Sequence, residues 1–359
     1  MARGNGGQRG TGRVTLTEVA ELAGVSRSAA SFALNGRTDL RISEETSERV
    51  RRAAEELGYS PNATAKTLRT GKSGTVALVS DFVGTTSVAN AMVRGALQTL
   101  RDADILLYTV DTQGDPELES RFLQNLRSRD IDGFLYASMF TRTVAVPALV
   151  RGAPFVLLNC VSEGADATAV VPDEFAAGET AAAALLSAGH RDDIWFVGDF
   201  PSGFTGGLEW HGWRPLALTQ RLEGIEATLA AAGTALAGRV PIDNDWDIAN
   251  GRDGVARLLD SGVTPSALIC VNDAVAVGAY HALQHAGLRV PDDVSVIAFD
   301  GSPLTAAVVP TLTSVALPHE ELGRLAAQLL VDDSSTPAVH RVPMSLSRGA
   351  SVAAPATTR

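Results

Sequence analysis

The stretch VTLTEVAELAGVSRSAASFALNG, residues 14–36, decides how the front of this chain folds. Thr15 precedes Glu18 by three residues, which is the spacing of a capping box at the start of a helix. Small and apolar side chains then recur at helical intervals until Gly24 interrupts the pattern. Ser26 is a natural N-cap for a second helix. Two short helices joined by a tight, glycine-containing turn predict a helix-turn-helix.

The second helix has a narrow front that fits the major groove of DNA. Arg27 and Ser28 lie in its first turn and Ser31 follows one turn later, so a few polar donors stand among small side chains. Phe32 has two interpretations, packing toward a third helix that begins after Ser43 or contact with a thymine methyl group. Such helix pairs also occur as plain packing, so the motif alone does not decide the function.

Residues 61–72, PNATAKTLRTGK, predict a short helix with one large apolar side chain. Leu68 is flanked by Lys66 and Arg69, which is the composition of a minor-groove wedge, because an apolar residue opens a base step while cations hold the phosphates. The alternative is an ordinary linker between domains.

Charge is unevenly distributed along the 359 residues. Residues 1–72 hold 12 Lys or Arg against 8 Asp or Glu, a net charge of +4, whereas the remainder holds 18 against 33, a net charge of −15. A basic front on an acidic body suggests that the front end meets a polyanion. A solvated helical domain that is basic for no such reason is the alternative.

The composition also bears on where the protein works. No apolar run reaches the roughly 18 residues that a membrane span needs, and residues 1–13 are basic without an apolar core, so we expect a flexible tail rather than a secretory signal. Cys160 and Cys270 are the only cysteines and lie far apart, which fits two free thiols in a reducing cytoplasm. We therefore expect a cytoplasmic protein.

From residue 74 onward, apolar runs typical of strands alternate with helical stretches. TVALVS, DILLYTV, DGFLYAS and FVLLNC recur about every 25 residues, and DIWFVGD, SALIC and SVIAFD follow. This βαβ pattern predicts parallel sheets, which bind ligands at the carboxyl ends of their strands. The polar residues at those ends suit a polyhydroxylated ligand; they are Asp81, Thr85, Tyr136, Asn159, Asn272 and Asp300.

Other chemistry finds little support in the sequence. His281 and His285 have a metal-ligand spacing on a helix, but no carboxylate or thiol nearby completes a site, and an exposed helix face is the preferred interpretation. No nucleophile elbow or catalytic triad spacing occurs. We therefore predict neither a metal, nor a cofactor, nor an enzymatic activity.

Taken together, these motifs resemble the LacI-type (lactose-repressor-like) family of transcription regulators. The resemblance rests on residues 14–36, on SEETSERVRRAAEELGYSPNATAKTLRTG, on VNDAVAVGAYHAL and on LRVPDDVSVIAFD. It implies a helix-turn-helix domain, a hinge helix and a two-lobed α/β sensor with parallel sheets, like a periplasmic sugar-binding protein. It also implies a homodimeric repressor of a palindromic DNA operator, controlled by a small-molecule effector, most simply a carbohydrate.

The resemblance further implies domain boundaries and site residues. The expected parts are a tail (1–13), the DNA-binding domain (14–60), the hinge (61–73), one lobe (74–172 with 319–335), the other lobe (173–318 with 336–350) and a second tail (351–359). Matching DNA-contact positions are Thr15, Leu16, Ser26, Arg27, Ser28, Ser31 and Asn35, and Asn62, Ala65 and Leu68 match the hinge helix. Arg221, Trp246, Asn272 and Asp300 match effector contacts, and His319 lies where the third crossover between the lobes ends.

Three departures from the family pattern stand out. Residues 29–32, AASF, lack an arginine that many relatives carry, and the loop 35–43 is about two residues longer than usual. The segment 203–215 holds Trp210 and Trp213, which would cover the pocket, pack at a dimer interface or tuck into a surface loop. The competing hypothesis for the whole chain is a sugar-binding protein or sugar-active enzyme with an incidental helical domain.

Overall fold

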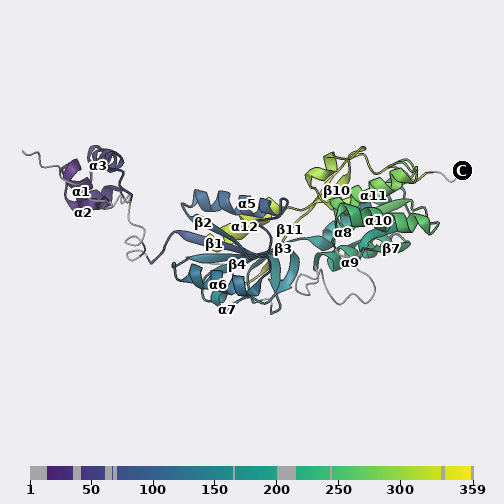
Figure 1. Cartoon of the computed structure of the whole chain (residues 1–359), viewed down its shortest axis with the longest axis horizontal. Coiled ribbons are helices and arrows are strands. Elements are labelled where there is room, and N and C mark those ends of the chain that lie inside the picture. Colours follow the sequence, from purple (N-terminus) through teal and green to yellow (C-terminus); the bar gives the residue numbers. More distant parts are fainter. Residues whose placement is uncertain are drawn as a thin grey trace, which may run out of the picture. The chain divides into compact units, whose positions relative to one another are not determined.

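The computed structural model describes residues 14–34, 42–60, 67, 71–164, 166–199, 216–242, 245–332 and 336–356. The chain divides into two compact units, Met1–Ser73 and Gly74–Arg359 (Figure 1). The first unit contains three helices in its described residues, and the second is a two-lobed α/β structure.

The first unit is built from α1 (Leu16–Ala23), α2 (Arg27–Leu34) and α3 (Glu44–Leu57). The capping box predicted at Thr15 and Glu18 is confirmed, and the hydroxyl of Ser26 accepts a hydrogen bond from the backbone N–H of Ala29 at 3.1 Å. The third helix begins at the predicted cap, Ser43, whose side chain accepts from the N–H of Thr46. A small core of valines and alanines joins the three helices, including Val19, Ala20, Ala23, Ala30, Val50, Ala53 and Ala54. The predicted helix-turn-helix is therefore confirmed.

The first lobe of the second unit is a six-stranded sheet in the order β11-β5-β4-β3-β1-β2, in which every neighbouring pair is parallel. Helices α5 and α12 pack on one face of this sheet, and α6 and α7 on the other. The elements are β1 (Thr75–Ser80), α5 (Asn90–Asp102), β2 (Leu106–Asp111), α6 (Pro116–Arg127), β3 (Gly133–Val144), α7 (Ala148–Arg151), β4 (Phe155–Ser162), β5 (Ala169–Pro172), α12 (His319–Asp332) and β11 (Val339–Val342).

The second lobe repeats the plan with the order β12-β10-β9-β8-β6-β7, in which only the β10–β12 pair of these described strands is antiparallel. Its elements are α8 (Glu174–Ala188), β6 (Ile194–Asp199), α9 (Leu216–Ala231), β7 (Gly238–Pro241), α10 (Ile248–Asp260), β8 (Ala267–Cys270), α11 (Asp273–His285), β9 (Ser295–Asp300), a 3₁₀ turn η1 (Pro303–Ala306), β10 (Thr313–Ala316) and β12 (Ser345–Ser347). The predicted class, two parallel α/β lobes behind a helical domain, is confirmed.

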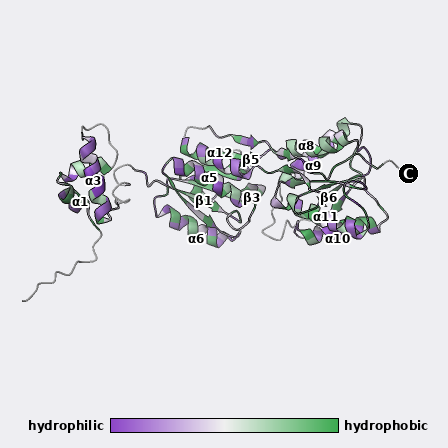
Figure 2. Cartoon of the chain, turned by 90° about the horizontal axis from the view of Figure 1, so that it is seen from above, coloured by the Kyte–Doolittle hydropathy of each residue, from purple (hydrophilic) through white to green (hydrophobic). Residues whose placement is uncertain are grey.

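Hydrophobic patterning explains the layers. Central strands such as β1 and β9 are buried almost throughout, as sheets covered on both faces require. The helices around them carry both hydrophilic and hydrophobic residues, as α6 and α10 show in Figure 2. The apolar stripes of the helices cover the sheets, and the polar stripes meet water.

Glycines bring the covering helices into backbone contact. A Cβ atom added to Gly178 in α8 would lie 2.2 Å from the carbonyl oxygen of Arg221 in α9, and one added to Gly224 would lie 2.1 Å from the carbonyl oxygen of Phe175. The pair α5 and α12 has the same arrangement at Gly95 and Gly323, and so does the pair α10 and α11. Three helix pairs therefore depend on positions that accept no larger residue.

Two predicted boundaries are wrong. Residues 336–350 were expected in the second lobe, but β11 pairs in parallel with β5 of the first lobe, so the chain crosses back only between Val342 and Ser345. The C-terminal residues from 351 were expected to be a tail. Instead the Ser351 hydroxyl donates to the carbonyl of Val296 at 2.5 Å and accepts from the N–H of Thr313 at 2.8 Å, which ties this segment to the second sheet.

We predict that Gly178→Ala destabilises the second unit. Alanine would gain about 1 kcal/mol in helix propensity, but overpacking a backbone contact costs about 3 kcal/mol, so the melting temperature should fall. The matched control is Gly152→Ala, whose added Cβ would have its nearest neighbour at an ordinary 3.6 Å. Thermal denaturation of both variants measures the difference, and equal melting temperatures would contradict the proposed packing constraint.

Candidate ligand pocket and nucleic-acid interface

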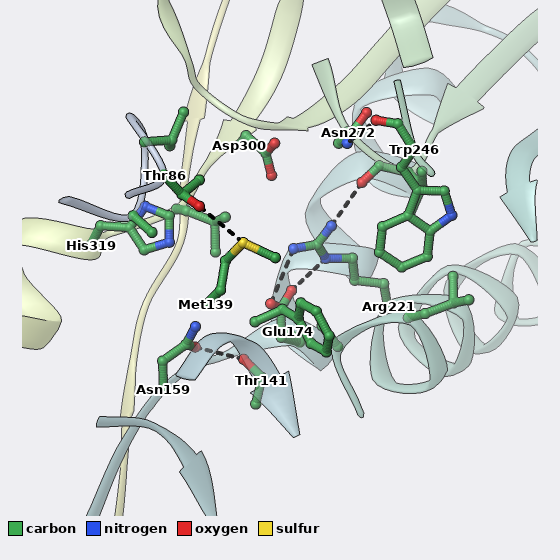
Figure 3. Close-up of a pocket in the computed structure, with 17 residues that line it drawn as sticks. Thr86, Met139, Thr141, Asn159, Glu174, Arg221, Trp246, Asn272, Asp300 and His319 are labelled. Carbon is green, nitrogen blue, oxygen red and sulfur yellow. Dashed lines mark hydrogen bonds and ion pairs between the residues drawn. The ribbon is translucent and has the colours of Figure 1, made fainter. Parts of the chain in front are cut away.

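A cavity of about 230 Å³ lies between the carboxyl ends of the two parallel sheets. The first lobe contributes Thr86, Met139, Thr141, Asn159 and His319, and the second lobe contributes Glu174, Arg221, Trp246, Asn272 and Asp300, among others (Figure 3). Because both lobes supply walls, a ligand here would hold them in a fixed relation.

Arg221 is a cationic side chain that lines the pocket, and its guanidinium is already hydrogen-bonded to other groups of the protein. Its Nε and one terminal nitrogen donate to the two carboxylate oxygens of Glu174 at 2.5 and 3.0 Å, and the other terminal nitrogen donates to the carbonyl of Val271 at 2.8 Å. The guanidinium also lies 4.6 Å from the ring centre of Phe299. Both charged side chains are almost fully buried, so the pair is a neutral unit rather than a free cation.

Asp300, the last residue of β9, is not paired as Arg221 is. Its carboxyl has no hydrogen-bond partner among the described residues, and its backbone adopts a left-handed φ of 109°. Burial raises the pKa of this carboxyl to about 8, and the nearby Asp273 and Glu174 carboxylates raise it further against the lowering effect of Arg221. At neutral pH the group is mainly protonated, so it both donates and accepts hydrogen bonds.

His319, the first residue of α12, is also uncharged at neutral pH. Burial lowers the pKa of its imidazole to about 4, and the positive charge of Arg221 lowers it as well. Behind the pocket wall, the carboxylate of Asp273 accepts from the Ser302 N–H and the Ser314 hydroxyl, both at 2.6 Å. The polar lining therefore carries little net charge.

The remaining polar residues of the pocket also serve the fold. The Asn159 side chain accepts from the Thr141 hydroxyl at 2.8 Å and donates to the carbonyl of Ser138 at 3.0 Å. Asn272 caps α11 by accepting from the Val275 N–H at 2.8 Å, and it donates to the carbonyl of Trp246 at 3.0 Å. Asn272 is thus the N-cap of α11, and its side chain still lines the cavity.

The structure brings together six of the nine predicted effector residues: Asn159, Arg221, Trp246, Asn272, Asp300 and His319. Asp81 and Tyr136 instead line a second cavity in the first lobe. Thr85 lines neither cavity, and its hydroxyl donates to Asp111 at 3.2 Å. Sequence reasoning missed Glu174, because an acidic residue in the first turn of a helix is ordinary, and it missed Met139 inside a strand.

The first unit presents a separate candidate interface on α2. Ser26, Arg27 and Ser28 are exposed at its first turn, whereas Ser31 and Phe32 are half-buried. The Thr15 hydroxyl is engaged in its capping box with Glu18, and Leu16 is half-buried against the core. The exposed face of α2 therefore carries the short polar side chains and the arginine that the sequence predicted for the groove.

Several predicted residues lie outside the described part of the chain. They are Asn35, which follows α2 in the sequence, the predicted hinge residues Asn62, Ala65, Lys66, Leu68 and Arg69, and Trp210 and Trp213 in the segment 203–215. Their roles stay predictions. Within the described ranges, no group of three or more His, Cys, Asp or Glu residues is placed to hold a metal ion. No helix among the same residues combines the length and the apolar composition of a membrane span.

Known protein families match both the helical first unit and the two-lobed second unit. Residues 15–62 match the family described as bacterial regulatory proteins, lacI family, and residues 182–352 match a periplasmic binding protein-like domain. The ribose operon repressor of Haemophilus influenzae is 30% identical over 323 residues, which cover 90% of this chain and 92% of the relative.

Solved structures of similar proteins extend the match. A lac repressor dimer bound to operator and an anti-inducer has a TM-score of 0.78 at 22% identity, and the match covers 96% of this chain and all of that one. A LacI family transcriptional regulator from Enterococcus faecium with bound ribose has a TM-score of 0.60 at 26% identity, covering 78% of this chain and 98% of that one.

The first of these structures supports the fold alone, whereas the ribose operon repressor matches nearly the whole length of the chain at a level that establishes kinship. Together with the helix-turn-helix and the two-lobed sensor, that match shows that this chain belongs to the lacI family of bacterial regulatory proteins, as a DNA-binding transcriptional repressor and not an enzyme.

Proposed function

We propose that the chain represses transcription from a palindromic operator, and that an uncharged, polyhydroxylated small molecule, a sugar, controls its operator affinity by binding between the lobes. The observation that carries this proposal is the near-neutrality of a pocket built from ionisable side chains. Arg221 is matched by Glu174, Asp300 holds a proton at neutral pH, and His319 is uncharged. An anionic or cationic ligand would find no free opposite charge among these groups.

The shape of the cavity supports the same ligand class. Trp246, Met139 and Leu218 supply apolar walls, while Asp300, His319 and Asn159 place polar groups around the space (Figure 3). A pyranose or furanose ring has an apolar face and a rim of hydroxyls, so it matches an aromatic wall with a few polar partners. The relative from Enterococcus faecium carries ribose, which supports a sugar for this chain as well.

Two copies of the chain would form a homodimer that binds DNA through the first unit of each copy. The exposed Ser26, Arg27 and Ser28 at the start of α2 would read base edges in the major groove. The hinge residues Asn62, Ala65, Lys66, Leu68 and Arg69 are proposed to enter the minor groove, with Leu68 as the wedge. Support comes from the match of residues 15–62 to the lacI family of bacterial regulatory proteins and from the similarity to the ribose operon repressor of Haemophilus influenzae, and the fold is shared with a lac repressor dimer bound to operator.

The mechanism would be linkage between two binding equilibria. A ligand shared by the two lobes favours the arrangement in which both walls contact it, and operator DNA favours one arrangement of the dimer's front ends. The ligand changes operator affinity by the factor by which DNA changes ligand affinity, since coupling between binding sites is reciprocal. The preference of the ligand for one state decides whether it acts as inducer or corepressor.

We predict that Asp300→Asn changes the pH dependence of stability. The folded carboxyl has a pKa of about 8 against an ordinary value of 3.8, so between these values the folded protein holds a proton that the unfolded chain has lost. This residue therefore lowers the free energy of unfolding as pH rises through that window. The melting temperature of the variant minus that of the native protein should therefore increase from about pH 5 to about pH 8. A difference that stays constant over this range would show that Asp300 holds no proton there.

Ligand binding is tested by a thermal-shift screen of neutral sugars, sugar phosphates and sugar acids, followed by calorimetric titration. We expect neutral sugars to give the positive responses, and Asp300→Ala to weaken them by about tenfold or more, because the site loses a side chain that can both donate to a hydroxyl and accept from one. The control Asp260→Ala makes the same truncation at an exposed position outside the pocket. A preference for anions, or equal affinity in both variants, would count against the proposal.

DNA reading is tested by selecting duplexes from a random pool and titrating them with Arg27→Ala. We expect a palindromic selected sequence, a loss of about tenfold or more in specific affinity for the variant, and a steep fall of affinity with salt from counterion release. Arg101→Ala, an equal loss of charge on α5 of the sensor, is the control and should bind normally. Equal losses on selected and unselected DNA would show that Arg27 reads no base.

A further inference from the structure

The first lobe contains a second cavity, of about 250 Å³, which shares no lining residue with the pocket between the lobes. It opens at the carboxyl ends of β1, β2 and β3 and is walled by the start of α6. Its polar lining consists of Asp81, Thr112, Asp115, Glu119, Tyr136 and Arg142. This second cavity thus lies at the edge of the sheet where parallel strands end, the position where parallel sheets bind ligands.

The floor of this second cavity is a buried ion pair. A terminal nitrogen of Arg142 lies 3.3 Å from Asp81, and its Nε donates to the Ser138 hydroxyl at 2.9 Å. Asp81 also accepts from the Ser138 hydroxyl and from the Met139 N–H, both at 2.8 Å. The two charges cancel, and their side chains are at most 10% exposed. Apolar residues would stabilise a purely structural core at least as well, so buried charges beside a cavity indicate a site.

The remaining charges in the cavity are negative. Glu119 accepts from the Tyr136 hydroxyl at 2.8 Å through one oxygen, and Asp115 caps α6 through one oxygen, which accepts from the N–H groups of Glu117 and Leu118. The second oxygen of each carboxylate has no hydrogen-bond partner among the described residues. Burial raises the pKa of Glu119, against the lowering effects of the Tyr136 hydroxyl and of the Arg142 charge, which Asp81 already pairs.

We propose that this second cavity is a binding site for a small molecule that carries a protonated amine, such as an amino sugar or an aliphatic diamine. The ammonium group would lie between Glu119 and Asp115 and donate to their two uncommitted oxygens. A neutral sugar would leave both carboxylates without a counter-charge, and an anion would be repelled by them. The site is distinct from the proposed sugar pocket and does not depend on it.

The two cavities share one wall, so their occupants would influence each other. In β3 the pairing with β4 jumps from Ala137–Leu158 to Arg142–Cys160, so residues 138–141 lie opposite Asn159 alone. This bulge turns Met139, Phe140 and Thr141 toward the pocket between the lobes, while Ala137 and Arg142 on either side line the second cavity. Asp81 holds the bulge at both ends, through Ser138 and Met139 and through Arg142.

Calorimetric titration of the full chain with glucosamine, putrescine and glucose tests the proposal. Glucosamine and glucose differ by an ammonium group in place of a hydroxyl, and putrescine carries amines without a sugar ring. We expect at least one amine to bind, Glu119→Gln to weaken it by about tenfold or more, and Glu117→Gln on the exposed side of the same helix to leave it unchanged. Asp115→Asn should also weaken it, and asparagine still caps α6.

Asp300→Ala separates this site from the sugar pocket. Amine binding that survives Asp300→Ala and is lost in Glu119→Gln supports the second site, whatever the sugar screen finds. Amine binding that is lost in Asp300→Ala and kept in Glu119→Gln belongs to the pocket between the lobes and overturns the proposal. The proposal also fails if neither amine binds, or if glucose and glucosamine bind the Glu119 site equally. The unliganded melting temperature of each variant confirms that it is folded.

Discussion

The backbone contact between α8 and α9 is the constraint on which the sensor pocket depends. Gly178 and Gly224 let the two helices approach until each glycine meets a carbonyl of the other helix, and one of these carbonyls belongs to Arg221. Glu174 lies one turn before Gly178, so the same approach places its carboxylate against the Arg221 guanidinium. The geometry of the ion pair is therefore set by two positions without side chains.

That ion pair sets the charge of the pocket. Moving a guanidinium and a carboxylate out of water is costly, and only a close, bidentate pairing with further hydrogen bonds offsets the cost. Once Arg221 is matched in this way, it adds no net charge to the cavity, and Asp300 is left as a buried acid whose pKa rises. Recognition then falls to neutral donors and acceptors, which suits hydroxyl groups better than charged ones.

Much of this arrangement was predictable from the sequence, because strands such as TVALVS and SVIAFD carry an unbroken apolar signal and the helix caps at Thr15, Ser26 and Ser43 have specific side chains. The position of β11 was not predictable, since four residues of mixed polarity fit either lobe. Asp81 and Tyr136 were expected in the pocket between the lobes but line the second cavity. The position of a residue at the end of a strand does not tell which side of the sheet edge its side chain faces. Glu174 has no sequence signal until Arg221 lies beside it.

Asp81, which lines the second cavity and not the pocket between the lobes, holds the bulge in β3 in place. Four residues face one partner residue there, so the backbone hydrogen bonds that would fix a regular strand are replaced by side-chain bonds from Asp81 and Asn159. A nearby ligand can compete for hydrogen bonds that side chains make, whereas the backbone hydrogen bonds of a regular sheet are not available to it. A wall of the sensor pocket thus depends on charges that lie outside that pocket. A ligand that draws on those charges would change the affinity for the proposed sugar, and the sugar would change the affinity for that ligand by the same factor.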